Sequence, residues 1–218
     1  MKKIVAINAS PRTEWNTSTL VRQAAMGAEA QGAEVKVFDI YKLDKFTGCV
    51  SCFGCKLPGN LGKCVCCDGL APVLEEIRKA DGLILGTPNY LGNVSSGFRA
   101  LYERLVFQAL SYKIEPRSYN QHLIPVLFIM TSNASEEYYT PEGYGGMLAN
   151  YQNTLSGFVG PTKLLLSSDT LQVNDYERYN WTKFDPDAKK QRHDTVFPED
   201  KKKAFELGAK MVSEPWEE

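Results

Sequence analysis

Residues 82–104 read GLILGTPNYLGNVSSGFRALYER, and this stretch decides the fold. Its first five residues are a continuous apolar run, which is typical of a parallel strand buried on both faces. From Ser95 the pattern changes to that of an amphipathic helix, which we expect to extend to Ala109. A buried strand that leads through a turn into a helix is one repeat of an α/β fold with a parallel sheet.

The segments on either side repeat this order of strand and helix. The further strands are expected at residues 3–8, 33–40, 122–130 and 162–167, and the further helices at residues 20–30, 71–80, 147–158 and 201–212. Five such repeats predict a doubly wound parallel sheet with helices on both faces. Two segments are longer than the connections that such repeats require. They are the tyrosine-rich residues 131–146 and the polar residues 172–198. We interpret both as insertions that cover a site or a partner surface.

The loop after the first strand gathers groups that bind an anion. Residues 8–19 read NASPRTEWNTST, and a helix is expected to open near Asn16. First-turn amides lack intrahelical partners and the helix dipole favours an anion there, so this loop predicts a phosphate site. It has neither GxGxxG nor GxxxxGK followed by Ser or Thr, so a flavin monophosphate held by hydroxyls fits better than a dinucleotide or a triphosphate. The alternative is that Ser10, Thr17 and Ser18 only cap the helix.

Together the two loops resemble a known family. SPRxxxNTxxL from Ser10 and TPNYLGNVSSGFRALYER from Thr87 are similar to the signature loops of the NADPH-dependent FMN reductase family, over roughly residues 1–110. The resemblance implies an FMN-containing oxidoreductase that can use NAD(P)H, in which the first loop binds phosphate and the second packs against the isoalloxazine ring. Trp15 departs from the family pattern, which usually has a small residue there. The residues carried over by position are Ser10, Arg12, Asn16, Thr17 and Ser18 for the phosphate, and Pro88, Asn89, Tyr90, Gly92 and Asn93 for the ring.

Flavin chemistry and sheet topology agree with that resemblance. A flavin needs a flat apolar seat and backbone donors, which a turn rich in Pro, Gly and Asn with one aromatic residue supplies. In the flavodoxin-like strand order 2-1-3-4-5, the ligand binds at the carboxyl ends of strands one and three. Those are the strands whose following loops carry the motifs. The alternative reading of the second loop is an ordinary turn between a strand and a helix.

All six cysteines lie between Cys49 and Cys67, in a cysteine-rich loop after the second strand. We expect the loop at the same edge of the sheet as the flavin. The chain begins without a recognisable export signal, so we expect reduced thiols with a metal or redox role. The spacing Cys49-x2-Cys52-x2-Cys55-x8-Cys64 resembles the cluster motif of the iron-sulfur flavoproteins, a branch of the same family, and predicts a 4Fe-4S cluster. The last spacer is longer than in that motif, and Cys66 or Cys67 could replace Cys64.

The same cysteines allow two other readings. Cys49, Cys52, Cys64 and Cys67 form two C-x2-C pairs, as in a four-thiolate zinc site, although the spacer between the pairs is short. A cluster uses Cys55 as well, whereas zinc does not. Alternatively, all six thiols are free, because flavin reductases of the resembled family can keep such cysteines without a metal.

Charge and composition limit the partners. The chain has 218 residues and a net charge of −1, so residues 1–218 are expected to form one domain without the basic field that attracts nucleic acid or an anionic membrane. No apolar run approaches the roughly 20 residues that span a bilayer, so we expect a cytoplasmic protein. His122 and His193 are the only histidines, which excludes a multi-histidine metal site. A homodimer or homotetramer is implied by the family resemblance alone.

The functional prediction is a redox protein without a catalytic side chain, which moves electrons between a donor, FMN and a 4Fe-4S cluster. The donor and acceptor are small molecules or proteins. One alternative is an NAD(P)H:acceptor reductase without a cluster, acting on quinones, nitroaromatics or metal ions. Another is a zinc-stabilised flavodoxin-like binding module.

Overall fold

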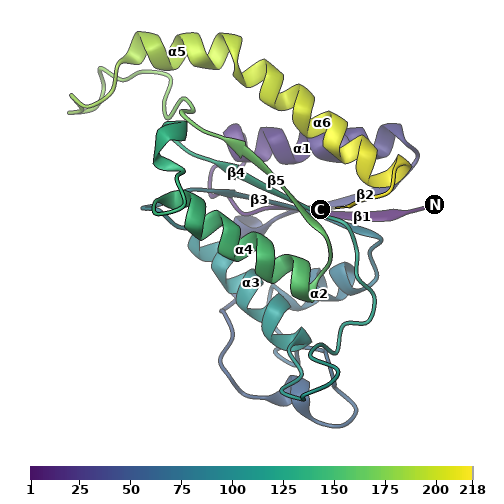
Figure 1. Cartoon of the computed structure of the whole chain (residues 1–218). Coiled ribbons are helices and arrows are strands. Elements are labelled where there is room, and N and C mark those ends of the chain that lie inside the picture. The colour runs from purple at the N-terminus through teal and green to yellow at the C-terminus, as the bar shows by residue number, and fades with distance from the viewer. Residues whose placement is uncertain (218) are drawn as a thin grey trace.

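The computed structural model describes residues 1–217. Five parallel strands form one sheet in the order β2-β1-β3-β4-β5, with helices on both faces (Figure 1). This arrangement confirms the predicted flavodoxin-like doubly wound sheet. The strands are β1 (Lys3–Asn8), β2 (Glu34–Asp39), β3 (Gly82–Pro88), β4 (Val126–Thr131) and β5 (Thr162–Ser167).

The described residues form six α-helices, of which α1 and α6 cover one face of the sheet and α2, α3 and α4 the other, while α5 leads into α6 (Figure 1). Five of them were predicted, with boundaries that differ by a few residues. Within residues 1–217, no helix combines the length and the apolar character needed to cross a lipid bilayer. The helices are α1 (Asn16–Ala30), α2 (Ala71–Arg78), α3 (Ser96–Ala109), α4 (Tyr144–Phe158), α5 (Pro186–Thr195) and α6 (Phe197–Ser213).

Helix α5 lies inside the polar insertion and was not predicted. Its sequence has no apolar period, so hydrophobic patterning gave no signal for it. The sequence nevertheless indicates where the helix begins. Asp185 accepts hydrogen bonds from the backbone N–H groups of Asp187 and Ala188, and Pro186 occupies the first turn. Both are standard helix-initiation signals.

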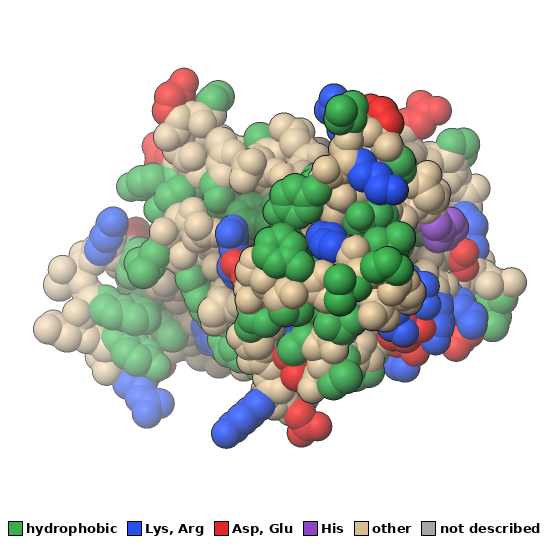
Figure 2. Space-filling view, turned by 90° about the horizontal axis from the view of Figure 1, so that it is seen from below, with side chains coloured by type: hydrophobic (Ala, Val, Ile, Leu, Met, Phe, Trp, Pro, Cys, Tyr) green, Lys and Arg blue, Asp and Glu red, His purple; other side chains and the backbone are tan. Residues whose placement is uncertain are grey.

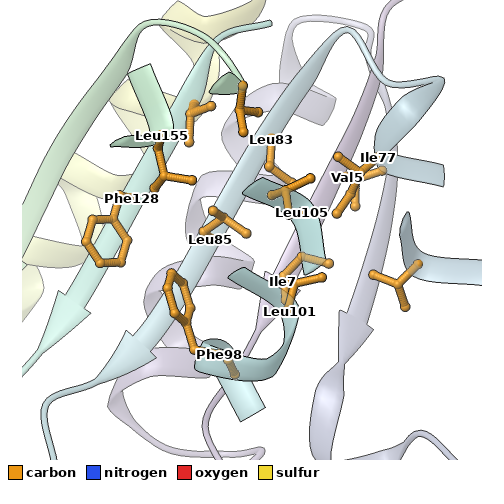
Figure 3. Packing of buried hydrophobic residues seen from close by; sticks show 14 of the residues in the cluster. Val5, Ile7, Ile77, Leu83, Leu85, Phe98, Leu101, Leu105, Phe128 and Leu155 are labelled. Atoms are coloured by element: carbon orange, nitrogen blue, oxygen red, sulfur yellow. The ribbon is translucent and has the colours of Figure 1, made fainter. Parts of the chain in front are cut away.

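The core is divided by the sheet into two layers. Alternate strand residues point to opposite faces, so a strand buried on both sides is apolar throughout. Every residue of β3 is buried. On the face covered by α2, α3 and α4, Leu83 and Leu85 pack with Phe98 and Phe128 (Figure 3). On the opposite face, Ile84 packs with small and aliphatic residues of α1 and α6.

Helices α1 and α6 approach so closely that their backbones touch. A Cβ atom placed on Gly208 of α6 would lie 1.9 Å from the backbone oxygen of Ala24 in α1. A Cβ on Gly27 of α1 would lie 1.9 Å from the backbone oxygen of Phe205. Glycine at these two positions is therefore a requirement of the packing.

Candidate functional site

The loop between β1 and α1, expected to bind phosphate, is tied together by its own hydroxyl groups. Ser10 is buried, and its Oγ accepts a hydrogen bond from the backbone N–H of Arg12 at 3.2 Å. Thr17 Oγ1 lies 2.7 Å from Thr131 Oγ1 at the end of β4. Ser18 Oγ accepts from the backbone N–H of Trp15 and donates to its carbonyl oxygen, as a capping residue does. The Thr17 and Ser18 hydroxyls thus both have protein partners.

The start of the polar insertion, residues 172–198, contacts this loop. Arg12 Nη1 donates to the carbonyl oxygen of Gln172 at 2.6 Å. Trp15 Nε1 and Asn16 Nδ2 both donate to the carbonyl oxygen of Leu171, at 3.2 and 2.8 Å. The Arg12 guanidinium also stacks 4.1 Å from the centroid of the Trp15 ring. Trp15, the departure from the family pattern, therefore anchors the segment that closes over the loop.

The loop after β3 is a tight turn. Tyr90 and Asn93 exchange backbone hydrogen bonds of 2.7 and 3.1 Å. Leu91 and Gly92 between them have φ angles of 54° and 78°, as in a type I′ turn. A Cβ on Gly92 would lie 2.8 Å from the ring of Tyr144, so glycine is required there for space as well. The turn leaves the Leu91 side chain fully exposed at its tip.

Hydrogen bonds from neighbouring segments fix both loops at the carboxyl edge of the sheet. Ser95 Oγ donates to the carbonyl oxygen of Ala9 at 2.6 Å, and Thr87 Oγ1 accepts from the backbone N–H of Ser95 at 3.0 Å. Asn89 Oδ1 accepts from the N–H of Gly92, while its Nδ2 donates to the hydroxyl of Tyr139. The bonds from Ser95 to Ala9 and from Asn89 to Tyr139 join residues far apart in sequence. Thr87, Ser95 and Tyr139 are not among the predicted site residues.

The predicted phosphate and ring residues meet at Arg12 and Tyr90. Burial raises the pKa of Tyr90, and the nearby positive charge of Arg12 opposes this rise. Burial in turn lowers the pKa of Arg12, which Tyr90 and Tyr179 of the insertion oppose. The first loop, the second loop and the insertion therefore converge around one guanidinium.

Two buried amide oxygens near this edge have no hydrogen-bond donor within residues 1–217. They are Asn133 Oδ1, just beyond β4, and Gln172 Oε1, in the insertion. A buried acceptor without a donor costs about 1–3 kcal/mol, so such atoms point to a missing partner. An open hollow lies nearby between the tyrosine-rich segment and the start of α5. Its walls include Asn133, Tyr138, Tyr144, Lys183, Phe184 and Lys189.

The cysteine-rich loop leaves the sheet edge after β2 and packs along the second half of α3. Ser51 and Phe53 have positive φ angles of 54° and 57°, which turn the chain sharply between the cysteines. Lys56 anchors the loop, because its ammonium group donates to the carbonyl oxygens of Phe107 and Leu110 at the end of α3. A cation is favourable at a helix C-terminus. Figure 2 views the molecule from below and shows apolar side chains interspersed with charged ones on this face.

Most of the thiols line one cavity. The walls of this cavity include Cys49, Cys52, Cys55, Cys64 and Cys66. Cys67 is not among its lining residues. Burial raises the pKa of Cys55 and of Cys66, which favours their neutral thiols. In the described part of the chain, no three metal-binding side chains are close enough together to hold a metal ion as they stand. The cysteines therefore share a cavity without being drawn together around a centre.

Arg104 of α3 lies in the wall of the same cavity and was missed from the sequence. Its side chain is fully buried, with Nη1 2.5 Å from Asp68 Oδ1 and Nη2 2.9 Å from the carbonyl oxygen of Cys66. Burial acts to raise the pKa of Asp68, but hydrogen bonds from Arg104 and from two backbone N–H groups outweigh it and lower that pKa. The pair is therefore ionised. The available signal was a charged residue on the apolar face of α3 between Leu101 and Leu105.

Helix α3 connects the two candidate sites. Its N-terminus follows the turn after β3, where Ser95 caps it by accepting from the N–H of Phe98. Arg104 lies eight residues beyond Ser96 in the chain, which is about 12 Å along the axis at 1.5 Å per residue. The cysteine-rich loop was expected at the same sheet edge as the loops after β1 and β3. The cysteine cavity instead lies further along α3, away from those loops.

A known protein family matches the part of the chain that carries these residues. The model of a family described as NADPH-dependent FMN reductase matches residues 2–136. That range contains both loops, all six cysteines and Arg104.

Curated relatives share part of the chain. An iron-sulfur flavoprotein of Methanocaldococcus jannaschii is 36% identical over 102 residues, which are 47% of this chain and 51% of that protein. An iron-sulfur flavoprotein of Archaeoglobus fulgidus is 29% identical over 139 residues, 62% of this chain and 63% of that protein. The chain therefore spans about half the length of the first relative and less than two thirds of the second.

Solved structures show the same fold over nearly the whole chain. An NAD(P)H:quinone oxidoreductase from Methanothermobacter marburgensis aligns with a TM-score of 0.70 and 12% identity, covering 96% of both chains. An azoreductase from Bacillus anthracis aligns with a TM-score of 0.65 and 13% identity, covering 96% of this chain and 100% of that one. The family model itself matches more than half of the 218 residues. The chain belongs to the NADPH-dependent FMN reductase family, as its two loops predicted.

Proposed function

We propose that this protein is an FMN-dependent oxidoreductase that moves electrons between a donor, FMN and a 4Fe-4S cluster. The observation that carries the proposal is the shared cavity of Cys49, Cys52, Cys55 and Cys64, on the same helix that begins at the flavin loops. Family membership supports FMN as the flavin. The relatives named as iron-sulfur flavoproteins support the cluster.

The residues at the carboxyl edge fit FMN. Ser10, Arg12 and the first-turn N–H groups of α1, around Asn16, Thr17 and Ser18, would hold the phosphate. The turn from Pro88 through Asn89, Tyr90 and Gly92 to Asn93 would seat the ring. The free acceptors Asn133 Oδ1 and Gln172 Oε1 suit the hydroxyl and N–H donors of a flavin with its ribityl chain. When bound, FMN supplies transfer of one or two electrons.

The cavity fits a cluster better than zinc. The zinc pattern requires Cys67, which does not line the cavity, whereas the cluster pattern requires Cys55, which does. A cluster supplies one-electron transfer to or from the flavin. The role of the chain would be to provide the thiolates, in a wall that also contains the apolar side chains of Val50, Phe53 and Phe107. NAD(P)H or a reduced protein would be the donor, and a homodimer or homotetramer the assembly.

A second candidate function is an NAD(P)H:acceptor reductase with free thiols. Two observations favour it. Among the described residues the thiols are not gathered at metal-binding distances, and burial raises the pKa of Cys55 and Cys66. Analysis of metal and labile sulfide content decides between the two candidate functions. Protein purified without oxygen is expected to contain about four irons and four labile sulfides per chain. Stoichiometric zinc, or no metal, would overturn the cluster.

The released cofactor is expected to be FMN and not FAD. The first loop offers one phosphate site, and the sequence has no glycine-rich dinucleotide loop for an adenylate. The measurement is chromatography of the flavin released by heat from the yellow protein. Released FAD, or failure to reconstitute any flavin, would contradict the proposed site.

Ser10→Asp is expected to weaken FMN binding at least tenfold, about 1.4 kcal/mol, because the new carboxylate stands near the phosphate. Ser10→Ala is the matched control, since it removes the hydroxyl without adding charge. Riboflavin, which lacks the phosphate, should bind the Asp and Ala variants alike. Fluorescence titration with both flavins measures the difference. An equal loss for FMN and riboflavin would show that Ser10 shapes the loop but does not face the phosphate.

A further inference from the structure

We propose that Arg104 is a positioning residue for the cluster: its Nε–H donates a hydrogen bond to a sulfur in the cysteine cavity and makes the cluster easier to reduce. The inference rests on the proposed function, because it requires a cluster in that cavity. It concerns a residue outside both loops and outside the cysteine motif.

Three fixed contacts orient the guanidinium. Nη1 bonds Asp68 Oδ1 and lies 3.5 Å from the carbonyl oxygen of Thr47, while Nη2 bonds the carbonyl oxygen of Cys66. Because the guanidinium is planar and its donors are arranged as a rigid fork, these contacts also fix the direction of Nε–H. Asp68 is itself held, since its carboxylate accepts from the N–H groups of Thr47 and Leu70.

Nε is the donor left over. Arg104 is 1% exposed, and its Nε is a buried polar atom without a hydrogen-bond partner among the described residues. A buried donor without an acceptor destabilises the fold, and more so on a charged group. A fully oriented, fully buried cation with one unmet donor therefore indicates an acceptor that occupies the site in the working protein.

The chemistry of the wall identifies that acceptor as sulfur. The cavity is lined by five thiols and by apolar side chains, and Gln108 Oε1 already accepts from the N–H of Cys64 at 2.9 Å. Asp68 is occupied by Nη1. Cys64 and Arg104 both belong to this wall, so the thiol and the guanidinium border the same cavity.

A donor at this position changes the reduction equilibrium of the cluster. Four thiolates give the bound cluster a net negative charge, and reduction adds another electron to it. A hydrogen bond to sulfur and a buried positive charge both stabilise the reduced form more than the oxidised form. Hydrogen bonds to the sulfurs and net charge are among the factors that set cluster potentials. Because the Arg104 side chain is buried, its positive charge is screened little by solvent.

The test compares cluster potentials in two arginine variants. Arg104→Lys keeps the positive charge but removes Nε–H, so its reduction is expected to be at least tenfold less favourable, a shift of about 59 mV to more negative potential. Arg22→Lys is the control, because Arg22 also pairs with a carboxylate, at 3.1 Å from Asp39, but lies on α1 across the sheet. Its potential should match that of the unchanged protein. A redox titration followed by electron paramagnetic resonance measures both.

A second measurement on the unchanged protein covers the case in which Arg104→Lys fails to fold or to hold iron. Protein carrying arginine isotopically labelled at Nε is reduced, and pulsed electron paramagnetic resonance is expected to show a nitrogen coupled to the cluster. Absence of that coupling, or an unshifted potential in Arg104→Lys, overturns the role of Arg104 while the cluster stands. Absence of iron from the unchanged protein overturns the proposed function and this inference together.

Discussion

Cys52→Ser protein, purified without oxygen, is expected to contain no iron while it retains FMN. Cys52 is the central residue of the closely spaced trio, and its thiol lines the cavity. Serine is a much poorer ligand for iron than a thiolate, so the cluster loses one of four attachments. The loops proposed to bind flavin are held by other contacts, such as the hydrogen bond from Ser95 Oγ to the carbonyl oxygen of Ala9, so they should keep their shape.

Cys67→Ser is the matched control for this loss. Cys67 lies in the same loop and carries the same thiol, but its side chain is exposed and does not line the cavity. Iron, sulfide and flavin should all remain at the level of the unchanged protein. Iron and labile sulfide assays, with flavin absorbance on the same samples, give the answer. If Cys67→Ser also lost its iron, the cavity would not be the cluster site.

Two further variants identify the fourth ligand. Both Cys64 and Cys66 line the cavity, and the backbone N–H of Cys64 is held by Gln108. Cys66 Sγ instead lies 3.8 Å from Asp68 Oδ2, an anion that would repel a thiolate. We therefore expect Cys64→Ser to lose iron and Cys66→Ser to keep it. The reverse result would exchange their roles.

Local sequence patterns were sufficient for the fold. The central strands could be predicted because a buried parallel strand requires an unbroken apolar run, and GLILG is such a run. The edge strand β2, EVKVFD, instead alternates polar and apolar residues. The helices facing the sheet have the period of about 3.6 residues that burial on one side imposes. Helix α5 has no apolar face, so its only signals were Asp185 and Pro186 at its start. The pattern of apolar residues therefore predicts a helix or strand only when that element buries one face or is buried completely.

The site was predictable where one loop carries the chemistry, and not where distant segments meet. The motif after β3 and the spacing of Cys49, Cys52 and Cys55 are local. The hydrogen bonds from Trp15 and Asn16 to Leu171 join residues more than 150 positions apart. The role of Arg104 depends on Asp68 in another segment, which has no fixed sequence relation to it. Such pairings follow from the assembled sheet.

Gly208→Ala is expected to lower the free energy of unfolding by roughly 3 kcal/mol, because one methyl group cannot fit between α6 and α1. The added Cβ would meet three backbone atoms of Ala24 at 1.9, 2.6 and 2.9 Å, far inside van der Waals contact. Backbone atoms cannot rotate away as a side chain can. The helices must therefore separate, which opens the layer where Ala204 and Met211 are fully buried.

Gly157→Ala makes the same chemical change with the opposite expected sign. Gly157 lies near the end of α4, is exposed, and has nothing within 4 Å of an added Cβ. Alanine restricts the unfolded chain and favours the helix, so we expect a gain of about 0.5 kcal/mol. Urea unfolding followed by circular dichroism compares both variants with the unchanged protein. Because propensity favours alanine at both positions, a loss at Gly208 alone isolates the backbone contact between α1 and α6. A gain at both positions would mean that the two helices are not in contact as described.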